Sequence, residues 1–179
     1  RLDSVELIPF SAAIERGVQS IMTAHISFPQ LSDSVGLPGT LDPHILTDIL
    51  KDSLGFEGII VTDGLGMKGI SNYFSPGNAV VAALKAGADL MLMSPDITTA
   101  IDEVLAAIET GELSIERVNK SVLKLLNWKI IHGLFDNKGE VALEKMAITI
   151  SSPEHIAESK RIAQQSITVL QNESNILPI

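Results

Sequence analysis

One aspartate has a position in the chain that could support chemistry. Asp63 ends the apolar, β-branched run 58–63 and precedes a loop that contains three glycines, Gly64, Gly66 and Gly69. Glycine lets the backbone approach a ligand closely and form turns that a Cβ would forbid. A carboxylate at a rigid strand end beside such a loop has the features of a nucleophile that attacks a sugar carbon. The alternative is that Asp63 only caps the following turn through its side-chain oxygen.

Three other polar side chains lie at the ends of apolar runs. His25 lies near the end of the run 20–26, where it could bond a substrate hydroxyl or transfer a proton, although packing histidines are commoner there. Asp96 follows the run 89–93 and is expected to cap the next helix. Asp89 begins that run, so we expect it at the opposite face of the sheet, in a structural role.

Composition excludes several classes of protein. With 179 residues, 45% of them hydrophobic, the chain can bury a core and is not disordered. The absence of cysteine excludes disulfide scaffolds, thiol nucleophiles and Cys-ligated metals. A net charge of -9 with 4% aromatic residues argues against nucleic acid as a partner. No apolar run approaches the roughly 20 residues that span a bilayer, so no membrane-spanning segment is expected.

No cofactor is expected either. No zinc-ligand spacing, phosphate-binding glycine motif or G-x-S-x-G elbow is present. The remaining histidines lie in or beside helical patterns, with no carboxylate at metal-ligand spacing: His44, His132 and His155. We therefore predict no metal site, and we expect these three residues to pack or to lie on the surface.

The elements that must position these residues alternate between strand and helix. Apolar runs predict strands over 20–26, 58–63 and 89–93. Helical spacing predicts helices over 45–54, 78–86, 99–108 and 115–131, with Ser114 as a cap and Gly55, Gly87 and Gly111 as stops. Apolar strands that are each followed by a helix indicate an α/β fold with a parallel sheet. Periodicity leaves a TIM-type barrel and a doubly wound sheet both open.

The chain changes character after about residue 135. The polar stretch 137–152 is predicted to be a linker. Beyond it, 154–165 has the pattern of an amphipathic helix, and 166–171 (Ser-Ile-Thr-Val-Leu-Gln) that of a strand.

Several segments carry a family resemblance in order along residues 5–135. They are 6–10 with 17–18, 21–25 (Ile-Met-Thr-Ala-His), 37–41 (Leu-Pro-Gly-Thr-Leu), 54–58, 61–67 (Val-Thr-Asp-Gly-Leu-Gly-Met), 86–93 and 133–135. Together they resemble the family 3 glycoside hydrolases, and within that family the β-N-acetylhexosaminidase branch.

The resemblance implies a fold, a reaction and roles for particular residues. It implies a (β/α)8 TIM-type barrel that hydrolyses glycosides with retention, with Asp63 as the nucleophile that forms a covalent glycosyl-enzyme intermediate. The form Thr-Asp-x-Leu-x-Met resembles the hexosaminidase type, so Met67 is expected to line the pocket and to bind substrate. His25 falls on a family position near the site and is expected to bind substrate. The family's acid–base, a histidine on a mobile loop, has no counterpart in this chain.

Three strands cannot close an eight-stranded barrel. We therefore interpret residues 1–136 as the C-terminal part of the catalytic barrel, and 153–179 as the start of a second α/β domain that follows the 137–152 linker. The chain begins with Arg1 rather than Met, and we expect it to be a piece of a longer protein. The missing N-terminal half of the barrel is then its partner, and the isolated chain is expected to be inactive and prone to aggregation.

The substrate implied by the resemblance is an amino-sugar oligosaccharide. The favoured reaction removes terminal β-linked N-acetylglucosamine from peptidoglycan- or chitin-type oligosaccharides. Two alternatives stay open: a glycoside phosphorylase of the same family, in which phosphate replaces water, and a non-catalytic carbohydrate-binding barrel fragment. The resemblance of the tail to longer family members favours an exported bacterial protein, periplasmic or extracellular.

Overall fold

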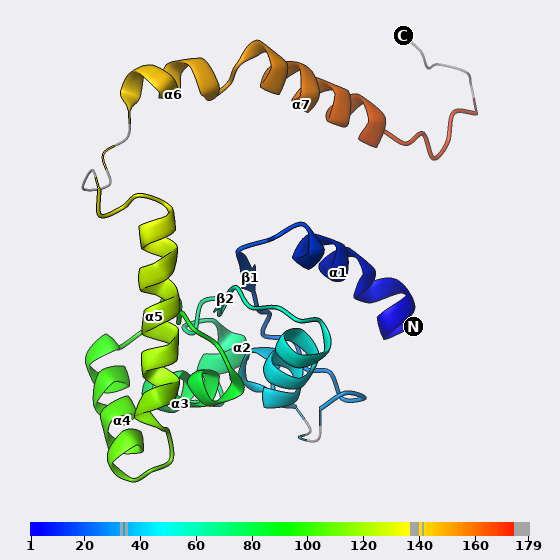
Figure 1. The fold of residues 1–179 in the computed structure, drawn as a ribbon. Helices are drawn as coiled ribbons and strands as arrows, with labels where there is room; N and C mark the ends of the chain where they lie inside the picture. The colour runs from blue at the N-terminus through cyan, green and yellow to red at the C-terminus, as the bar shows by residue number, and fades with distance from the viewer. Residues whose placement is uncertain (33, 35, 137–139, 141, 174–179) are drawn as a thin grey trace. The chain divides into compact units, whose positions relative to one another are not determined.

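A computed structural model describes residues 1–32, 34, 36–136, 140 and 142–173 of the chain (Figure 1). The chain divides into two compact units, Arg1–His132 and Gly133–Ile179. Among the described residues, no helix combines the length and the apolarity required to cross a lipid bilayer.

Parallel strands form the centre of the first unit. β1 (Ser20–Met22) pairs with β2 (Ile59–Val61), with Ser20 opposite Ile59 and Met22 opposite Val61. The predicted third strand runs parallel to β2 on its other side, through a bridge between Val61 and Leu90. The predicted parallel α/β arrangement is therefore confirmed.

The third segment is less regular than the sequence predicts. The Thr62 N–H donates to the Leu90 carbonyl, but the Leu92 N–H donates to the Thr62 side-chain oxygen, at 2.9 Å in each case. Met93 then takes a left-handed conformation with φ of +49°. Because the Thr62 hydroxyl replaces a backbone acceptor, the regular ladder stops at a single bridge, and the expectation of a full strand over 89–93 was wrong.

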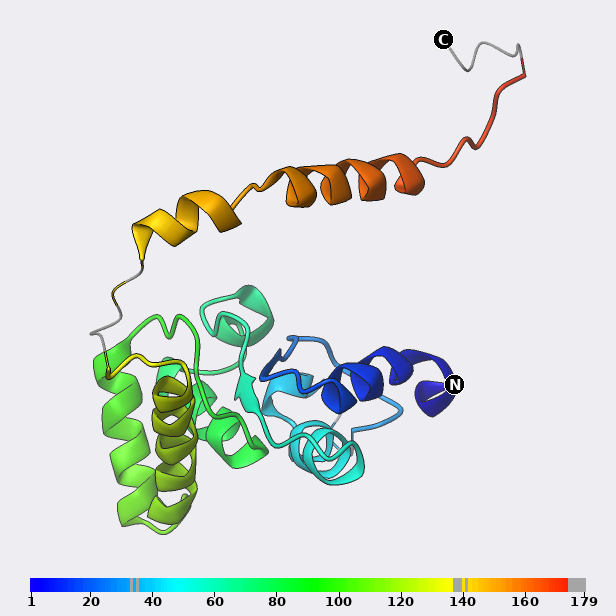
Figure 2. The same cartoon turned by 45° about the horizontal axis from the view of Figure 1, so that its top comes forward.

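Helices surround the short sheet. The first unit contains η1 (Leu2–Glu6), α1 (Ile8–Glu15), η2 (Gly39–Leu41), η3 (His44–Ser53), α2 (Lys68–Ser71), α3 (Pro76–Ala86), α4 (Ile97–Glu109) and α5 (Ile115–Ile131). In both views α3, α4 and α5 gather on one side of the strands, with α1 and η3 on the other (Figures 1 and 2). The four helices predicted in this unit are confirmed, with bounds that differ from the prediction by at most two residues.

Local signals set the ends of these helices. The Asp96 carboxylate accepts a hydrogen bond from the Thr99 N–H at 3.0 Å, and Ser114 Oγ accepts one from the Arg117 N–H at 3.1 Å. Gly87 and Gly111 follow α3 and α4 with φ of +123° and +76°, a region that favours glycine. The predicted caps at Asp96 and Ser114 are therefore confirmed.

The core lies between the strands and the helices that cover them. Its largest fully buried side chains include Leu46, Ile60, Leu65 and Ile70, and α3 adds small residues such as Ala83 and Ala86. Because alanine has only a Cβ, it permits the close packing of α3 against α4, η2 and η3. Leu65 anchors the loop that follows Asp63 in this core.

The second unit is helical where the structure describes it. It contains α6 (Leu143–Thr149) and α7 (Pro153–Ser166), the latter close to the predicted helix 154–165. α6 lies within the stretch predicted as linker. The strand predicted over 166–171 was wrong: Ser166 ends α7, and residues 167–171 are irregular. Ile167 and Leu170 are 75% and 94% exposed, because the described part of this unit contains no strand to pair with.

Candidate active site

Asp63 lies where the parallel strands end. It comes directly after Thr62, the first residue beyond the carboxyl end of β2, and its side chain is half-buried. Asp63 Oδ1 accepts a hydrogen bond from the Gly64 N–H at 2.7 Å. Within the described part of the chain, Oδ2 has no hydrogen-bond partner and no cation lies within 4 Å of the carboxylate. One oxygen is thus fixed, and the other is left for a ligand.

The loop after Asp63 packs against the third parallel segment. The Leu65 N–H donates to the Leu92 carbonyl at 2.9 Å. A Cβ on Gly66 would lie 3.4 Å from Pro95 Cγ, which is ordinary van der Waals contact. Neither Gly64, Gly66 nor Gly69 has a positive φ. A Cβ would be most crowded at Gly69, where it would lie 3.1 Å from the Cβ of His25.

His25 reaches this loop from the segment that follows β1. Its Nε2 lies 2.9 Å from the Gly64 carbonyl oxygen, and its Nδ1 lies 2.9 Å from Thr40 Oγ1. Thr40 is fully buried and lies 2.8 Å from the hydroxyl of Thr23. The structure therefore brings His25 and the Asp63 loop together through Gly64, and both ring nitrogens of His25 have protein partners.

Two methionines flank the same loop. The Met67 N–H donates to the Gly64 carbonyl at 3.0 Å, and its side chain is 51% exposed. A Cβ on Gly64 would lie 3.8–3.9 Å from the Met67 side chain and 3.9 Å from Met93 Cβ. Met93 is 75% exposed and has φ of +49°, a strained conformation of a kind that clusters at active sites. The spacing of the sequence singles out neither Met93 nor Thr40, although Thr40 lies in the segment 37–41 that supports the family resemblance.

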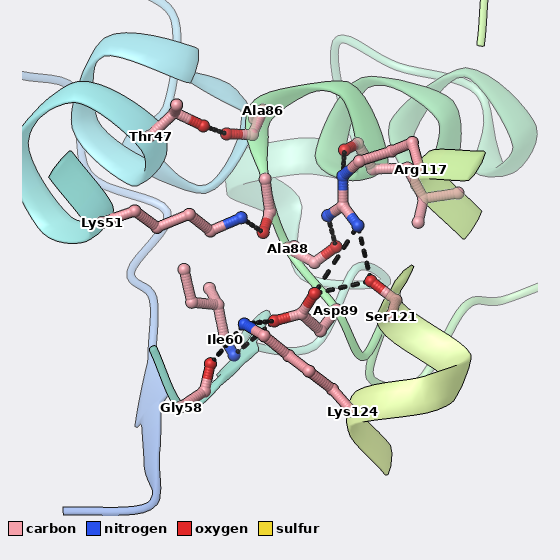
Figure 3. Close-up of polar contacts among 12 residues, drawn as sticks. Thr47, Lys51, Gly58, Ile60, Ala86, Ala88, Asp89, Arg117, Ser121 and Lys124 are labelled. Carbon is pink, nitrogen blue, oxygen red and sulfur yellow. Dashed lines mark hydrogen bonds and ion pairs between the residues drawn. The ribbon is translucent and has the colours of Figure 1, made fainter. Parts of the chain in front are cut away.

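Asp89 lies at the opposite, amino-terminal side of the strands. It is 4% exposed. One carboxylate oxygen accepts from the Ser121 hydroxyl at 2.5 Å, and the other accepts from the Ile60 N–H and the Lys124 ammonium, each at 3.1 Å (Figure 3). Arg117 Nη1 lies 3.6 Å from the first oxygen. As expected from its position, Asp89 joins β2 to α5 and has a structural role.

Burial, hydrogen bonds and neighbouring charges shift two pKa values in the region around Asp89. Burial alone would raise the pKa of Asp89, but hydrogen bonds from Ser121 and the Ile60 N–H, with the Lys124 ammonium, hold it below the usual value. Burial lowers the pKa of Lys51 to about 8, and the nearby Asp89 carboxylate offsets only part of that effect. Lys51 donates to the Gly87 carbonyl at 2.6 Å. Among the described residues, no group of three or more His, Asp or Glu side chains could hold a metal ion.

Comparisons with known proteins relate this chain to one family of enzymes. Residues 1–128 match the model of the glycosyl hydrolase family 3 N terminal domain. A β-N-acetylglucosaminidase/β-glucosidase from Cellulomonas fimi is 30% identical over 180 residues, covering 96% of this chain and 32% of that protein. β-Hexosaminidase A from Pseudoalteromonas piscicida is 29% identical over 198 residues, covering 100% of this chain and 32% of that protein.

A solved structure supports the same relationship. The glycoside hydrolase family 3 β-N-acetylglucosaminidase from Paenibacillus sp. str. FPU-7 is 37% identical, with a TM-score of 0.81 over 97% of this chain and 33% of that one. Other relatives are named β-glucosidases or β-xylosidases. The chain spans about a third of the length of the relatives it matches.

Proposed function

This chain belongs to glycosyl hydrolase family 3, and we propose that it supplies the nucleophile, Asp63, of a retaining enzyme that removes terminal β-linked N-acetylglucosamine. Its first unit is part of the TIM-type α/β barrel domain of that family. Its relatives are glycoside hydrolases that include β-hexosaminidases. One observation carries the proposal: the Asp63 carboxylate lies at the carboxyl end of β2, with one oxygen fixed and the other unpartnered among the described residues.

The geometry of Asp63 fits the first chemical step. Asp63 Oδ2 attacks the anomeric carbon and forms an ester, while the bond from that carbon to the leaving oxygen breaks and an acid protonates the leaving oxygen. The Gly64 N–H, at 2.7 Å from Oδ1, restricts rotation of the carboxylate and leaves Oδ2 as the attacking atom. The loop therefore orients the nucleophile before the substrate arrives.

The second step releases Asp63. Water attacks the same carbon, the group that acted as acid takes a proton from that water, and the ester bond to Asp63 breaks. Two inversions at one carbon give net retention. We propose that the acid–base is a histidine outside this chain, on a part of the barrel that the parent protein supplies.

The preference for N-acetylglucosamine rests on the surroundings of Asp63. The sequence Thr-Asp-Gly-Leu-Gly-Met over 62–67 places Met67 beside Gly64, with its side chain 51% exposed. An exposed thioether suits contact with the apolar part of a sugar substituent, such as the methyl of an acetamido group. We propose that Met67 lines this part of the pocket, and that peptidoglycan- or chitin-type oligosaccharides are the source of the sugar.

Covalent trapping tests the proposal most directly. The parent protein is treated with a 5-fluoro N-acetylglucosaminyl fluoride, which slows breakdown of the ester, and is then digested and analysed by mass spectrometry. The label is expected on the peptide that contains Asp63. Nitrophenyl glycosides of N-acetylglucosamine, glucose and xylose, each assayed in phosphate and in a neutral buffer, measure the preferred sugar and separate hydrolysis from phosphorolysis. A label on any other residue, or none with an active enzyme, would contradict the proposal.

A further inference from the structure

We propose that His25 positions the Asp63 loop rather than contacting the sugar. Its part in the reaction rests on the proposed role of Asp63 as nucleophile. Its part in ordering the loop rests only on contacts within this chain. Three observations support the assignment: the partners of its ring nitrogens, the position of Gly64, and the packing of Gly69.

The hydrogen bonds of the imidazole are almost fully determined by their partners. A carbonyl oxygen only accepts, so Nε2–H of His25 must donate to the Gly64 oxygen at 2.9 Å. In the neutral ring Nδ1 is then the acceptor, and the Thr40 hydroxyl donates to it at 2.9 Å. The Thr23 hydroxyl in turn donates to Thr40 Oγ1 at 2.8 Å. The hydrogen bonds thus run from Thr23 through Thr40 and His25 to the Gly64 carbonyl in the loop. They use both ring nitrogens of His25.

Gly64 connects His25 to the carboxylate of Asp63. The Gly64 N–H donates to Asp63 Oδ1 at 2.7 Å, and its carbonyl accepts from His25 and from the Met67 N–H at 2.9 and 3.0 Å. A rotation of the Gly64 backbone that broke the bond to His25 would therefore also move the donor that holds Oδ1. His25 acts on the nucleophile through one residue.

His25 also contacts the far end of the loop. Gly69, in α2, lies so close that a Cβ on it would be 3.1 Å from His25 Cβ and 3.4 Å from the His25 carbonyl oxygen. The loop is thus held by a hydrogen bond at Gly64 and by packing at Gly69. Fixing two points of a short loop restricts the residues between them.

Kinetics of the parent protein separate positioning from substrate binding. His25→Leu removes both hydrogen bonds, and we expect kcat to fall about 10–100-fold, because a displacement near 1 Å can cost ~100-fold in rate. KM should change by less than about twofold, since no contact with the sugar is lost. His25→Gln offers an amide N–H near the position of Nε2 and should restore most of kcat. A rise in KM with kcat unchanged would show that His25 binds substrate and would overturn the proposal.

Two variants test the same contacts without removing the imidazole. Thr40→Val deletes the donor to Nδ1, with Thr40→Ser as the conservative rescue. Gly69→Ala pushes on His25 Cβ while favouring the helix in which it lies. Each is expected to lower kcat by several-fold with KM nearly unchanged. His132→Leu is the matched control, because His132 bonds Gln19, directly before β1 and at the other end of that strand.

Amide hydrogen exchange provides a readout that does not depend on Asp63 being the nucleophile. The Met67 N–H shares the Gly64 carbonyl with His25, so its exchange should become at least tenfold faster in His25→Leu, while the Ile60 N–H, bonded to Asp89, should not change. If covalent trapping fails at Asp63 but the exchange of Met67 responds, the proposed reaction is wrong and the positioning role stands. Unchanged Met67 exchange in both His25→Leu and Thr40→Val would refute the positioning role.

Discussion

Asp63 and Asp89 lie at opposite ends of adjacent parallel segments and have opposite surroundings. Asp63 is half-buried and accepts a hydrogen bond only from its neighbour Gly64 within the described part of the chain. Asp89 is 4% exposed and accepts from Ser121, Lys124 and the Ile60 N–H. An aspartate at one end of the sheet thus has a carboxylate oxygen available to a ligand, whereas the aspartate at the other end has both oxygens hydrogen-bonded.

The difference separates chemistry from stability. A buried carboxylate is tolerated only when its oxygens are paired, and once paired it is not available to react. At the carboxyl ends of the strands, one oxygen of Asp63 stays unpartnered in the described chain, which suits a nucleophile but contributes little to folding. We therefore expect substitutions at Asp63 to change activity, and substitutions at Asp89 to change the free energy of unfolding.

The largest expected effect is the loss of activity in Asp63→Asn. An amide cannot form the ester, so turnover by the parent protein should fall by at least about 10³-fold. The free energy of unfolding should change by less than about 0.5 kcal/mol, because only a bond to the adjacent N–H is altered. Turnover and chemical denaturation measure the two quantities on the same preparation.

Asp96→Asn is the matched control for that variant. Asp96 follows the next parallel segment and caps α4, so it has a similar position without the proposed role. Its substitution should leave turnover within about twofold, since asparagine is also a good cap. Retained activity in Asp63→Asn would contradict the expectation that Asp63 serves the reaction while Asp89 serves stability.

The next effect is on stability, in Asp89→Ala. This substitution leaves the Lys124 ammonium and the Arg117 guanidinium without their carboxylate, and removing one partner of a buried ion pair typically costs about 3–5 kcal/mol. Urea denaturation should show a loss of that order, against less than about 1 kcal/mol for Asp63→Ala. Equal losses in the two variants would contradict the comparison.

The regions of the chain differ in how far the sequence predicts them. Residues next to a helix end determine its cap, so Asp96, Ser114 and Gly87 could be assigned from local pattern alone. The parallel arrangement follows from apolar runs alternating with helices, and this pattern alone predicts that Asp63 and Asp89 lie at opposite ends of the sheet. The short third segment could not be predicted, because it depends on the Thr62 hydroxyl replacing a backbone acceptor.

The candidate site was predicted in part. Asp63, His25 and Met67 do lie around one loop. The contact of His25 with Gly64 joins residues 39 positions apart, and no periodicity encodes it. The left-handed backbone of Met93 is equally invisible, because methionine has no preference for positive φ. Such contacts come from packing between the segments that follow β1, β2 and the third parallel segment, which local residue pattern does not specify.

The pH dependence of the Asp89 contribution sharpens the comparison further. The folded-state pKa of Asp89 lies below its ordinary value, so its stabilising contribution is full above the unfolded pKa of about 4. It is lost as pH falls through the lower, folded-state pKa. The stability difference between the wild type and Asp89→Ala should therefore be constant from about pH 5 to 7 and shrink below about pH 4. A difference that grew on acidification would contradict the assignment of Asp89 as an ionised partner.

A pH effect above neutrality concerns Lys51, which lines the same charged region as Asp89. Its folded-state pKa is about 8, below the ordinary lysine value of about 10.4, so between these two pH values the unfolded chain binds more protons than the folded one. Wild-type stability should therefore rise relative to Lys51→Met as pH increases from about 8 to 10.4, while the difference stays flat from about pH 6 to 7. The bond from Nζ to the Gly87 carbonyl survives deprotonation, because a neutral amine still donates. Denaturation of both proteins at matched pH values measures the trend. A difference independent of pH in the Lys51 pair would place the ammonium in solvent rather than in the half-buried position that its contacts give it.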